Sequence, residues 1–506
     1  MWTRRGFSLS KRLPIFYSAL LLTAVNLLLR LVGTGFQVYL SSKIGAAGIG
    51  LLQLIMGVGG LALVAGMAGI RTAAMYLTAE ELGKNKKENI RWILSSCFLY
   101  SILCSGTVAA LLYYFSPKIA EIWIGDLQAI APLRLYAAIL PLTCLCGVMT
   151  GYFTAANRIG TLAIIEIAEQ LCSMSVTIGL LTFRAGTGAG QACQCILLGS
   201  GAGSMLTLVC LVLLYLKNST NKLMPISVGP RLIHAAVPLA AADVLKAGIN
   251  TAENLMVPKR LQRNASVADP LAAFGLVSGM VFPVLMFPAC ILYALAELLI
   301  PELARCHAAG SSVRIEYLAR RSLKITMLYG LLFGGLMFLL AEPLCLKLYE
   351  NPAAANHLQL YALLVPMLYC DTIIDAMTKG LGQQKICVQY NILSSALDVA
   401  FLFILLPEFG MDGYFISFLI THLINFLLSL HRLMKISHVT IPFYSPAISF
   451  AAAGAAIIAT SGIQGSIGKI IGYVTMLGSL LTIFQIISIE DIRWILGLLK
   501  IKKRPA

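Results

Sequence analysis

The chain has 506 residues, of which 58% are hydrophobic and only 12% are charged, and its mean hydropathy is +0.84. A soluble domain carries about 25% charged residues, so this composition excludes a soluble globular protein and predicts a polytopic membrane protein. The net charge of +16 fits membrane topology better than a nucleic-acid partner, and the thirteen cysteines show no metal-ligand spacing.

Fourteen apolar segments are long enough to cross a bilayer, which takes about 20 helical residues. Because backbone polar groups inside lipid must be hydrogen-bonded within the segment, we expect an all-α fold of fourteen transmembrane helices. The segments lie at 13–42, 49–79, 91–115, 132–155, 161–183, 191–216, 232–256, 271–300, 322–346, 357–378, 386–406, 412–431, 442–461 and 467–489.

Basic residues are distributed unequally between the two ends of these segments. If the N-terminus is cytoplasmic, 26 of the 38 lysines and arginines fall on the inside and nine on the outside. The positive-inside rule therefore predicts that both termini are cytoplasmic, in a multi-pass protein of a bacterial cytoplasmic membrane. The same cations are expected to bind anionic lipid headgroups.

An internal repeat recurs at an offset of 225 residues. Residues 132–142 read PLRLYAAILPL and residues 357–367 read HLQLYALLVPM, while Gly50 is matched by Gly275 at the same offset. Six segments separate the copies, so both copies run in the same direction across the membrane. The pseudo-symmetry axis should then lie along the membrane normal, with a central site between the halves.

The repeat divides the chain into three predicted parts. Residues 1–220 form an N-terminal six-helix lobe, and residues 221–436 form a second six-helix lobe. Residues 437–506 add two further helices and a basic C-terminal tail.

The first segment carries an arginine near its middle. A guanidinium at that depth costs roughly 2.5 to 3.5 kcal/mol on insertion scales, so its helix face should border a bundle interior or an aqueous cavity. No acidic residue lies within 12 positions of this arginine, so its partner is expected on another helix or on a ligand. One helical stripe contains Thr23, Asn26, Arg30, Gly33 and Gln37.

The seventh segment carries a second polar stripe. Asp243, Lys246, Asn250 and Glu253 recur at helical spacing, and Asn254 borders them. The repeat relates this segment to the first, so the leading helix of each lobe has a polar face with a cation in mid-membrane. Lys246 pairs either with Asp243 on its own helix or with a ligand.

Other charged residues allow two interpretations each. Arg71, in a glycine-rich second segment, either snorkels to the cytoplasmic surface or faces the cavity. The acids Glu166, Glu169, Asp371, Asp375 and Asp398 form salt bridges to neighbouring cations, or they bind a coupling proton or cation. The chain has no G-x-S-x-G, Walker or H-x-x-x-H motif, so we expect no catalysis, no cofactor and no metal site.

Three stretches resemble the stage V sporulation protein B family. They are the run from Asn26 to Ala73, which begins NLLLRLVGTGFQ, then GYFTAANR at 151–158 and MTKGLGQQ at 377–384. That family consists of polysaccharide-biosynthesis exporters of the multidrug/oligosaccharidyl-lipid/polysaccharide (MOP) flippase superfamily, and the resemblance covers most of the chain. It implies two six-helix lobes plus two helices, in agreement with the repeat.

The resemblance also implies a function and a site. It implies a flippase that moves an undecaprenyl-pyrophosphate-linked peptidoglycan or polysaccharide precursor by alternating access, for spore cortex or cell-wall synthesis. In the similar lipid II flippases, arginines of the leading helices line the cavity, and Arg30 matches one such position. Phe36 stands where a second arginine is usual, and Arg71 replaces the proline of G-I-P-T.

The sequence thus predicts a set of cavity residues and partners, and two rival functions stay open. The predicted cavity residues are Arg30, Asn26, Gln37, Arg71, Lys246, Asn250, Glu253 and Asn254, and Asp243 joins the possible coupling acids. Predicted partners are the lipid-linked precursor, anionic lipids and cell-wall synthesis proteins, without nucleic acid, around a monomer. One rival is a cation-coupled multidrug exporter, which favours an acid in the first lobe's cavity. The other is a membrane glycosyltransferase or polymerase, which needs outer-loop carboxylates.

Overall fold

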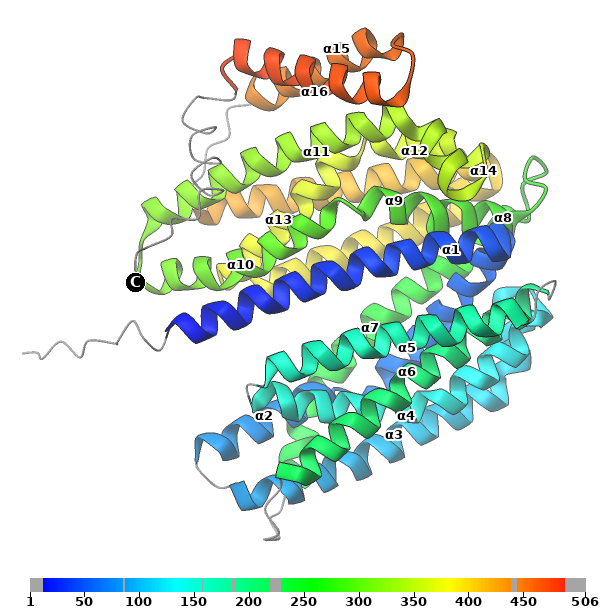
Figure 1. The fold of residues 1–506 in the computed structure, drawn as a ribbon, viewed down its shortest axis with the longest axis vertical. Coiled ribbons are helices and arrows are strands. Elements are labelled where there is room, and N and C mark those ends of the chain that lie inside the picture. Colours follow the sequence, from blue (N-terminus) through cyan, green and yellow to red (C-terminus); the bar gives the residue numbers. More distant parts are fainter. Residues whose placement is uncertain are drawn as a thin grey trace, which may run out of the picture. The chain divides into compact units, whose positions relative to one another are not determined.

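The computed structural model describes residues 12–84, 87–156, 158–183, 188–218, 229–437 and 444–486, and these residues are helical with short connections (Figure 1). The α-helices are α1 Arg12–Met67, α2 Ile70–Gly83, α3 Ile90–Lys118, α4 Ile130–Ala155, α5 Ile159–Phe183, α6 Ala189–Asn218, α7 Gly229–Leu261, α8 Pro270–Gly275, α9 Phe282–Met286, α10 Ala289–Ala308, α11 Ser312–Tyr349, α12 Ala353–Ala362, α13 Val365–Gly380, α14 Gln384–Ser437, α15 Tyr444–Ser461 and α16 Ser466–Ile483. Two π-helical segments, η3 Ile119–Ile124 and η5 Leu276–Val281, follow α3 and α8. The predicted all-α fold is confirmed.

Glycines divide the two longest helices. Helices α1 and α14 have 56 and 54 residues, and each would extend about 80 Å if straight, more than twice the hydrocarbon thickness. The backbone leaves helical geometry at Gly45, with φ 70°, and at Gly410, with φ 58°. Glycine adopts these positive φ values without the steric penalty of a Cβ. Each helix therefore provides two spans, and Figure 1 shows the chain reversing direction within α1.

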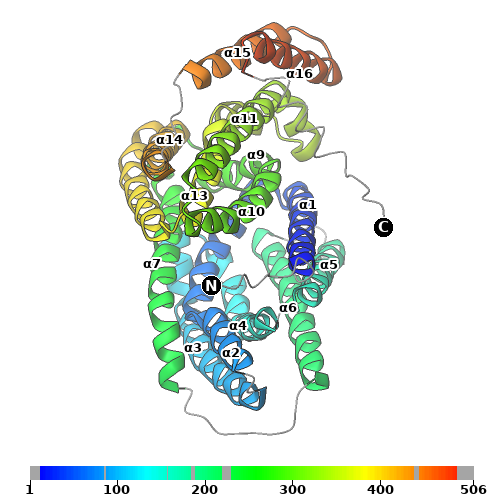
Figure 2. The same ribbon diagram turned by 90° about the vertical axis from the view of Figure 1, so that its left-hand side faces the viewer.

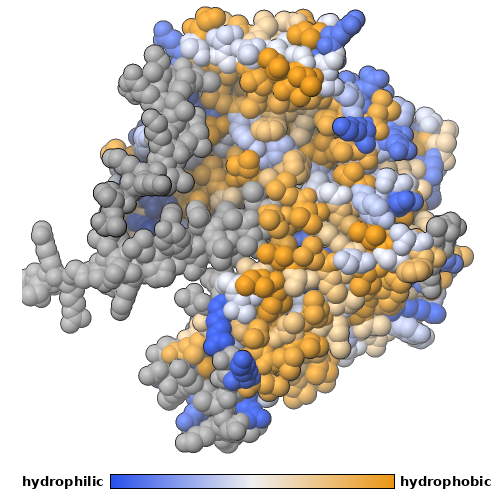
Figure 3. All heavy atoms as spheres, in the orientation of Figure 1, coloured by the Kyte–Doolittle hydropathy of each residue, from blue (hydrophilic) through white to orange (hydrophobic). Residues whose placement is uncertain are grey.

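The number of spans is consistent with the sequence. Among the described residues, eight helices are long and apolar enough to cross a membrane, or ten if two bent pairs each count as one span. Halving α1 and α14, and adding α7 and the shorter apolar α15, gives a total consistent with the fourteen predicted segments. Hydrophobic residues cover much of the face in Figure 3, as a lipid-exposed surface requires.

The chain forms two compact units. The first unit contains residues 1–280 and 395–417, and the second contains 281–394 and 418–506. In the first unit, Ile70, Leu77, Ile93 and Leu232 belong to one buried cluster that joins α2, α3 and α7. The division into sequence repeats at residue 220 stays a prediction.

Repeat-related glycines meet inside the first unit. Helices α1 and α8 pack so closely that a Cβ on Gly50 would overlap the carbonyl of Leu271, and one on Gly275 would overlap the carbonyl of Ala46. Leu271 follows Ala46 by the same 225 residues that separate the two glycines. The contact is thus reciprocal, as contacts across a twofold axis are. We call these four residues the glycine contact.

In the second unit, α15 and α16 lie side by side and pack on α11 (Figures 1 and 2). The buried Tyr473 of α16 donates a hydrogen bond from Oη to the carbonyl oxygen of Leu331, 2.8 Å away. Its ring fills the space above Gly335, where a Cβ would overlap the phenol. The last two helices are therefore fixed to α11 by one tyrosine in a site that only glycine leaves open.

Gly335→Ala is expected to lower the free energy of unfolding by about 1–3 kcal/mol, because the added methyl group overfills this site. Thermal unfolding of the detergent-solubilised protein measures the effect. Gly454→Ala, on α15, is the control, since open space surrounds that glycine. Equal midpoints for the two variants would contradict the described docking of α16.

Candidate functional site

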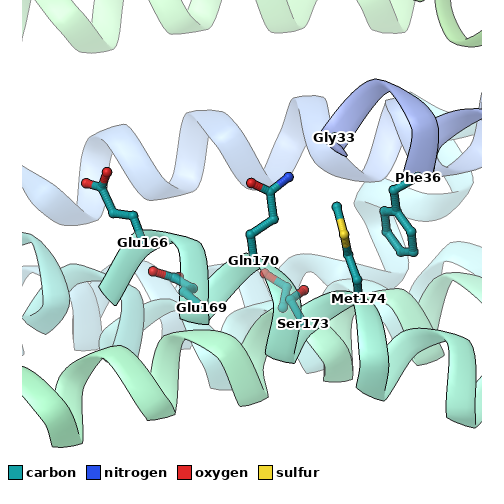
Figure 4. Close-up of a pocket in the computed structure, with 8 residues that line it drawn as sticks. Gly33, Phe36, Glu166, Glu169, Gln170, Ser173 and Met174 are labelled. Carbon is teal, nitrogen blue, oxygen red and sulfur yellow. The ribbon is translucent and has the colours of Figure 1, made fainter. Parts of the chain in front are cut away.

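A polar cavity of about 310 Å³ opens between α1, α5 and α6 in the first unit. Figure 4 shows its α5 side chains lying beside Gly33 and Phe36 of α1. The lining residues are Gly33, Phe36, Glu166, Glu169, Gln170, Ser173, Met174 and Ser200. Two acids predicted as coupling residues therefore share one cavity with the first polar stripe.

Gln170 joins α5 to α1 at this cavity. Its Nε2 donates a hydrogen bond to the carbonyl oxygen of Leu29, 3.1 Å away, one residue before Arg30. A Cβ on Gly33 would lie 3.2 Å from the same Nε2, tighter than ordinary packing. The glycine of the predicted stripe thus leaves room for a side chain from α5.

The two cavity acids have different environments. Glu169 accepts hydrogen bonds from Thr207, at 2.7 Å, and Ser204, at 3.5 Å, both on α6. Glu166 lies within electrostatic range of Arg71, which is exposed on α2. Both interpretations of Glu166 stay predictions, whereas hydroxyl groups stabilise Glu169.

The second polar stripe is exposed along the middle of α7. Asp243, Lys246 and Asn250 are exposed, whereas Glu253 and Asn254 are half-buried. Among the residues whose side chains the structure describes, Lys246 forms no ion pair. Both interpretations of Lys246, a partner on its own helix or a ligand, stay predictions.

Helix α7 packs against α1 through a residue that the periodicity did not single out. The hydroxyl of buried Thr251 donates to the carbonyl oxygen of Gly57, 3.0 Å away. Asn254 lies beside the same glycine. On the first half of α1, Arg30 is exposed, and the side chain of Asn26 lies outside the described residues.

Two predicted acids from distant parts of the chain meet in the first unit. The carboxyl groups of Glu253, on α7, and Asp398, on α14, are in hydrogen-bond contact. Asp398 also accepts a hydrogen bond from Ser417, at 2.6 Å. Sequence reasoning missed Ser417, because an isolated serine in an apolar helix carries no signal.

The remaining predicted coupling acids lie in the second unit. Asp371 accepts a hydrogen bond from Asn425, at 3.1 Å, and Asp375 pairs with Lys379, at 2.5 Å, one turn along α13. The salt-bridge interpretation therefore describes Asp375. Among the described residues, no group of three or more histidine, cysteine, aspartate or glutamate side chains could hold a metal ion.

Gln37 has a protein partner in the structure. Its Nε2 donates to the carbonyl oxygen of Gly279, 3.3 Å away, in the π-helix η5. Helix α1 thereby contacts η5 one turn beyond the glycine contact. The amide was predicted to face a cavity, and the structure ties it to the backbone of a second element.

Comparisons with known proteins agree with this architecture. The family model MatE matches residues 22–178 and 264–404. The chain is 22% identical over 445 residues to stage V sporulation protein B of Bacillus subtilis (strain 168), covering 85% of this chain and 86% of that protein.

Two solved structures share the fold. One is the lipid II flippase MurJ in an inward closed conformation, with a TM-score of 0.70, 16% identity, and coverage of 92% of this chain and 98% of that chain. The other is an inward-facing multidrug resistance MATE family transporter of the MOP superfamily, with a TM-score of 0.63 and 14% identity. The match to this transporter covers 84% of the present chain and 100% of the transporter's chain.

Proposed function

Since this chain belongs to the MatE family and, with it, to the MOP flippase superfamily, we propose that its cargo is an undecaprenyl-diphosphate-linked peptidoglycan or polysaccharide precursor. It is a multi-pass membrane protein, and the members it resembles are transporters and flippases. In this proposal both termini are cytoplasmic and the headgroup moves to the outer leaflet. We further propose that the protein is a monomer whose partners are anionic lipids and cell-wall synthesis proteins.

The observation that carries the proposal is the exposure of charged groups halfway along two spanning helices. Arg30 lies near the middle of the first half of α1, and Lys246 lies near the middle of α7. Both are exposed, and α7 packs on the second half of α1, where Thr251 bonds to the carbonyl of Gly57. Charged side chains at that depth avoid lipid, so the proposal requires an aqueous cavity that reaches both residues during transport.

The chemistry of these residues suits a diphosphate sugar. A guanidinium binds phosphate through paired hydrogen bonds, and an ammonium neutralises it as a point charge. Arg30 and Lys246, with Arg71 at the cytoplasmic end, would hold the diphosphate, while amides such as Asn250 and Asn254 would bind sugar hydroxyls. The prenyl chain would stay in the lipid.

Two forces would drive the headgroup outward by alternating access. Moving a negative group out of a negative-inside cell gains about 2.3 kcal/mol per charge per 100 mV. The second force would be a pH gradient: in this proposal Glu253 and Asp398 share one proton, because two carboxylates have no donor between them, and separating the two carboxyl groups releases it.

Asp398→Asn is expected to abolish the response of transport to a pH gradient while the response to membrane potential remains, because an amide holds Glu253 without a shared proton. One pH unit corresponds to about tenfold in an equilibrium, so the parent's distribution of precursor between leaflets should shift by up to about tenfold. Proteoliposomes with separately imposed gradients measure both responses. Asp412→Asn, exposed on the same helix, is the control. Equal pH responses in Asp398→Asn and the parent would exclude this pair from coupling.

A second function is favoured by one observation, the acids Glu166 and Glu169 in the first unit's cavity. A cation-coupled multidrug exporter needs such an acid. The two functions separate in one experiment, in which proteoliposomes receive either a fluorescent undecaprenyl-diphosphate sugar or a cationic dye. Translocation of the lipid without dye export supports the proposed function, and dye export alone supports the exporter.

A further inference from the structure

The glycine contact continues into a second layer that involves the π-helix. The side chain of Ile49 is 1% exposed, and a Cβ on Gly279 would overlap it. Gly279 is the residue whose carbonyl oxygen accepts the hydrogen bond from Gln37. Three pieces of chain therefore meet here: the two halves of α1 and the π-helix η5.

A π-helical turn is a local distortion that often occurs at functional sites, and side-chain donors stabilise carbonyl groups displaced from regular geometry. Gln37 supplies such a donor to η5. Losing the donor leaves the Gly279 carbonyl short of a partner and weakens the packing of η5 on Ile49. Gln37 is thus placed to hold the glycine contact closed.

Gln37 also belongs to the polar stripe that contains Arg30. The two residues are seven positions apart on one helix face, a rise of about 10 Å. A headgroup whose phosphate binds Arg30 can therefore place a sugar hydroxyl near the amide of Gln37. One amide group then has two alternative partners, the cargo and the π-helix.

We propose that Gln37 is a positioning residue that couples occupancy of the polar stripe to opening of the glycine contact. Without cargo, its amide donates to Gly279 and keeps the contact closed. With cargo bound, the amide turns to a hydroxyl or phosphate oxygen of the headgroup, and η5 separates from Ile49. The proposal rests on the proposed function for the identity of the cargo, whereas the link between Gln37 and the contact stands on geometry alone.

The test is the labelling rate of Ile49→Cys by a membrane-impermeant maleimide in sealed, right-side-out membrane vesicles. The rate of the unmodified chain is subtracted, because it has thirteen cysteines of its own. Without added lipid, Gln37→Leu and Gln37→Glu, which both lack the donor, should each speed labelling by about 2- to 10-fold, the range for one hydrogen bond. Thr34→Val is the control, since its hydroxyl bonds only to the carbonyl of Arg30 on its own helix.

An undecaprenyl diphosphate sugar is then added to the vesicles. It should speed labelling in the Gln37 parent by a similar factor and produce no further change in Gln37→Leu. Equal lipid-free rates in the parent and both Gln37 variants would overturn the proposal, whatever the cargo is. If the lipid-free difference appears but the lipid leaves the parent unchanged, the coupling to a diphosphate cargo is wrong, and the translocation assay with other headgroups then tests the proposed function separately.

Discussion

Arg30→Ala is expected to reduce translocation of the diphosphate-linked precursor by about 30-fold, because losing a hydrogen bond between charged groups costs about 2 kcal/mol. The exposed position of Arg30 in mid-span provides the physical reason, since no neutral side chain there can compensate the phosphate charge. The measurement is the initial rate of headgroup exposure in proteoliposomes, normalised to the amount of folded protein.

Two matched variants test the charge itself. Arg30→Lys keeps the charge but not the paired hydrogen bonds, so it should retain more activity than alanine and less than the parent. Lys246→Ala should lower the rate in the same direction as Arg30→Ala, whereas Asp243→Asn, on the same stripe, removes no cation and should not lower it. A normal rate in Arg30→Ala at normal protein level would remove this residue from the site.

The second large effect is expected at the glycine contact. Gly275→Leu should abolish transport, because any side chain there overlaps the backbone around Ala46 and prevents closure between α1 and α8. Because the contact is reciprocal, Gly50→Leu should also abolish transport, since its side chain would overlap Leu271. Both variants should leave Ile49→Cys permanently open to the maleimide.

Gly60→Ala on α1 is the control for these variants, because nothing lies near that position. Size-exclusion chromatography in detergent separates a locked protein from an unfolded one. Active transport by Gly275→Leu, or opposite phenotypes for the two leucine variants, would contradict a closing contact between repeat-related glycines.

Apolar length and periodicity were sufficient to predict the helices, whereas the two polar stripes stay predictions. Apolar length alone indicated a division of α1 near Gly45 and of α14 near Gly410, since each helix is too long for one crossing. The eighth predicted segment is bent by 63° beside Pro288, where the ring removes a helical hydrogen bond. Helix length and helix breaks depend on neighbouring residues, so a short stretch of sequence is enough to predict them.

Contacts between side chains on different helices could not be predicted from the sequence. Glu253 and Asp398 are 145 positions apart, and only the tertiary fold brings their carboxyl groups together. The π-helix was equally hidden, because an i to i+5 turn leaves no periodic signal over six residues. Gln37 shows why a residue type does not fix a role, since an amide serves a sugar or a backbone carbonyl equally well.

The central claim is that cations on α1 and α7 recognise a diphosphate, and headgroup selectivity tests it most directly. Proteoliposomes containing the parent or an Arg30→Ala/Lys246→Ala double variant receive fluorescent undecaprenyl lipids that differ only in having a diphosphate, a monophosphate or no phosphate before the sugar. The account predicts that the parent moves the diphosphate lipid fastest and the neutral lipid slowest, and that the double variant loses this order. Equal rates for all three lipids in the parent would contradict it.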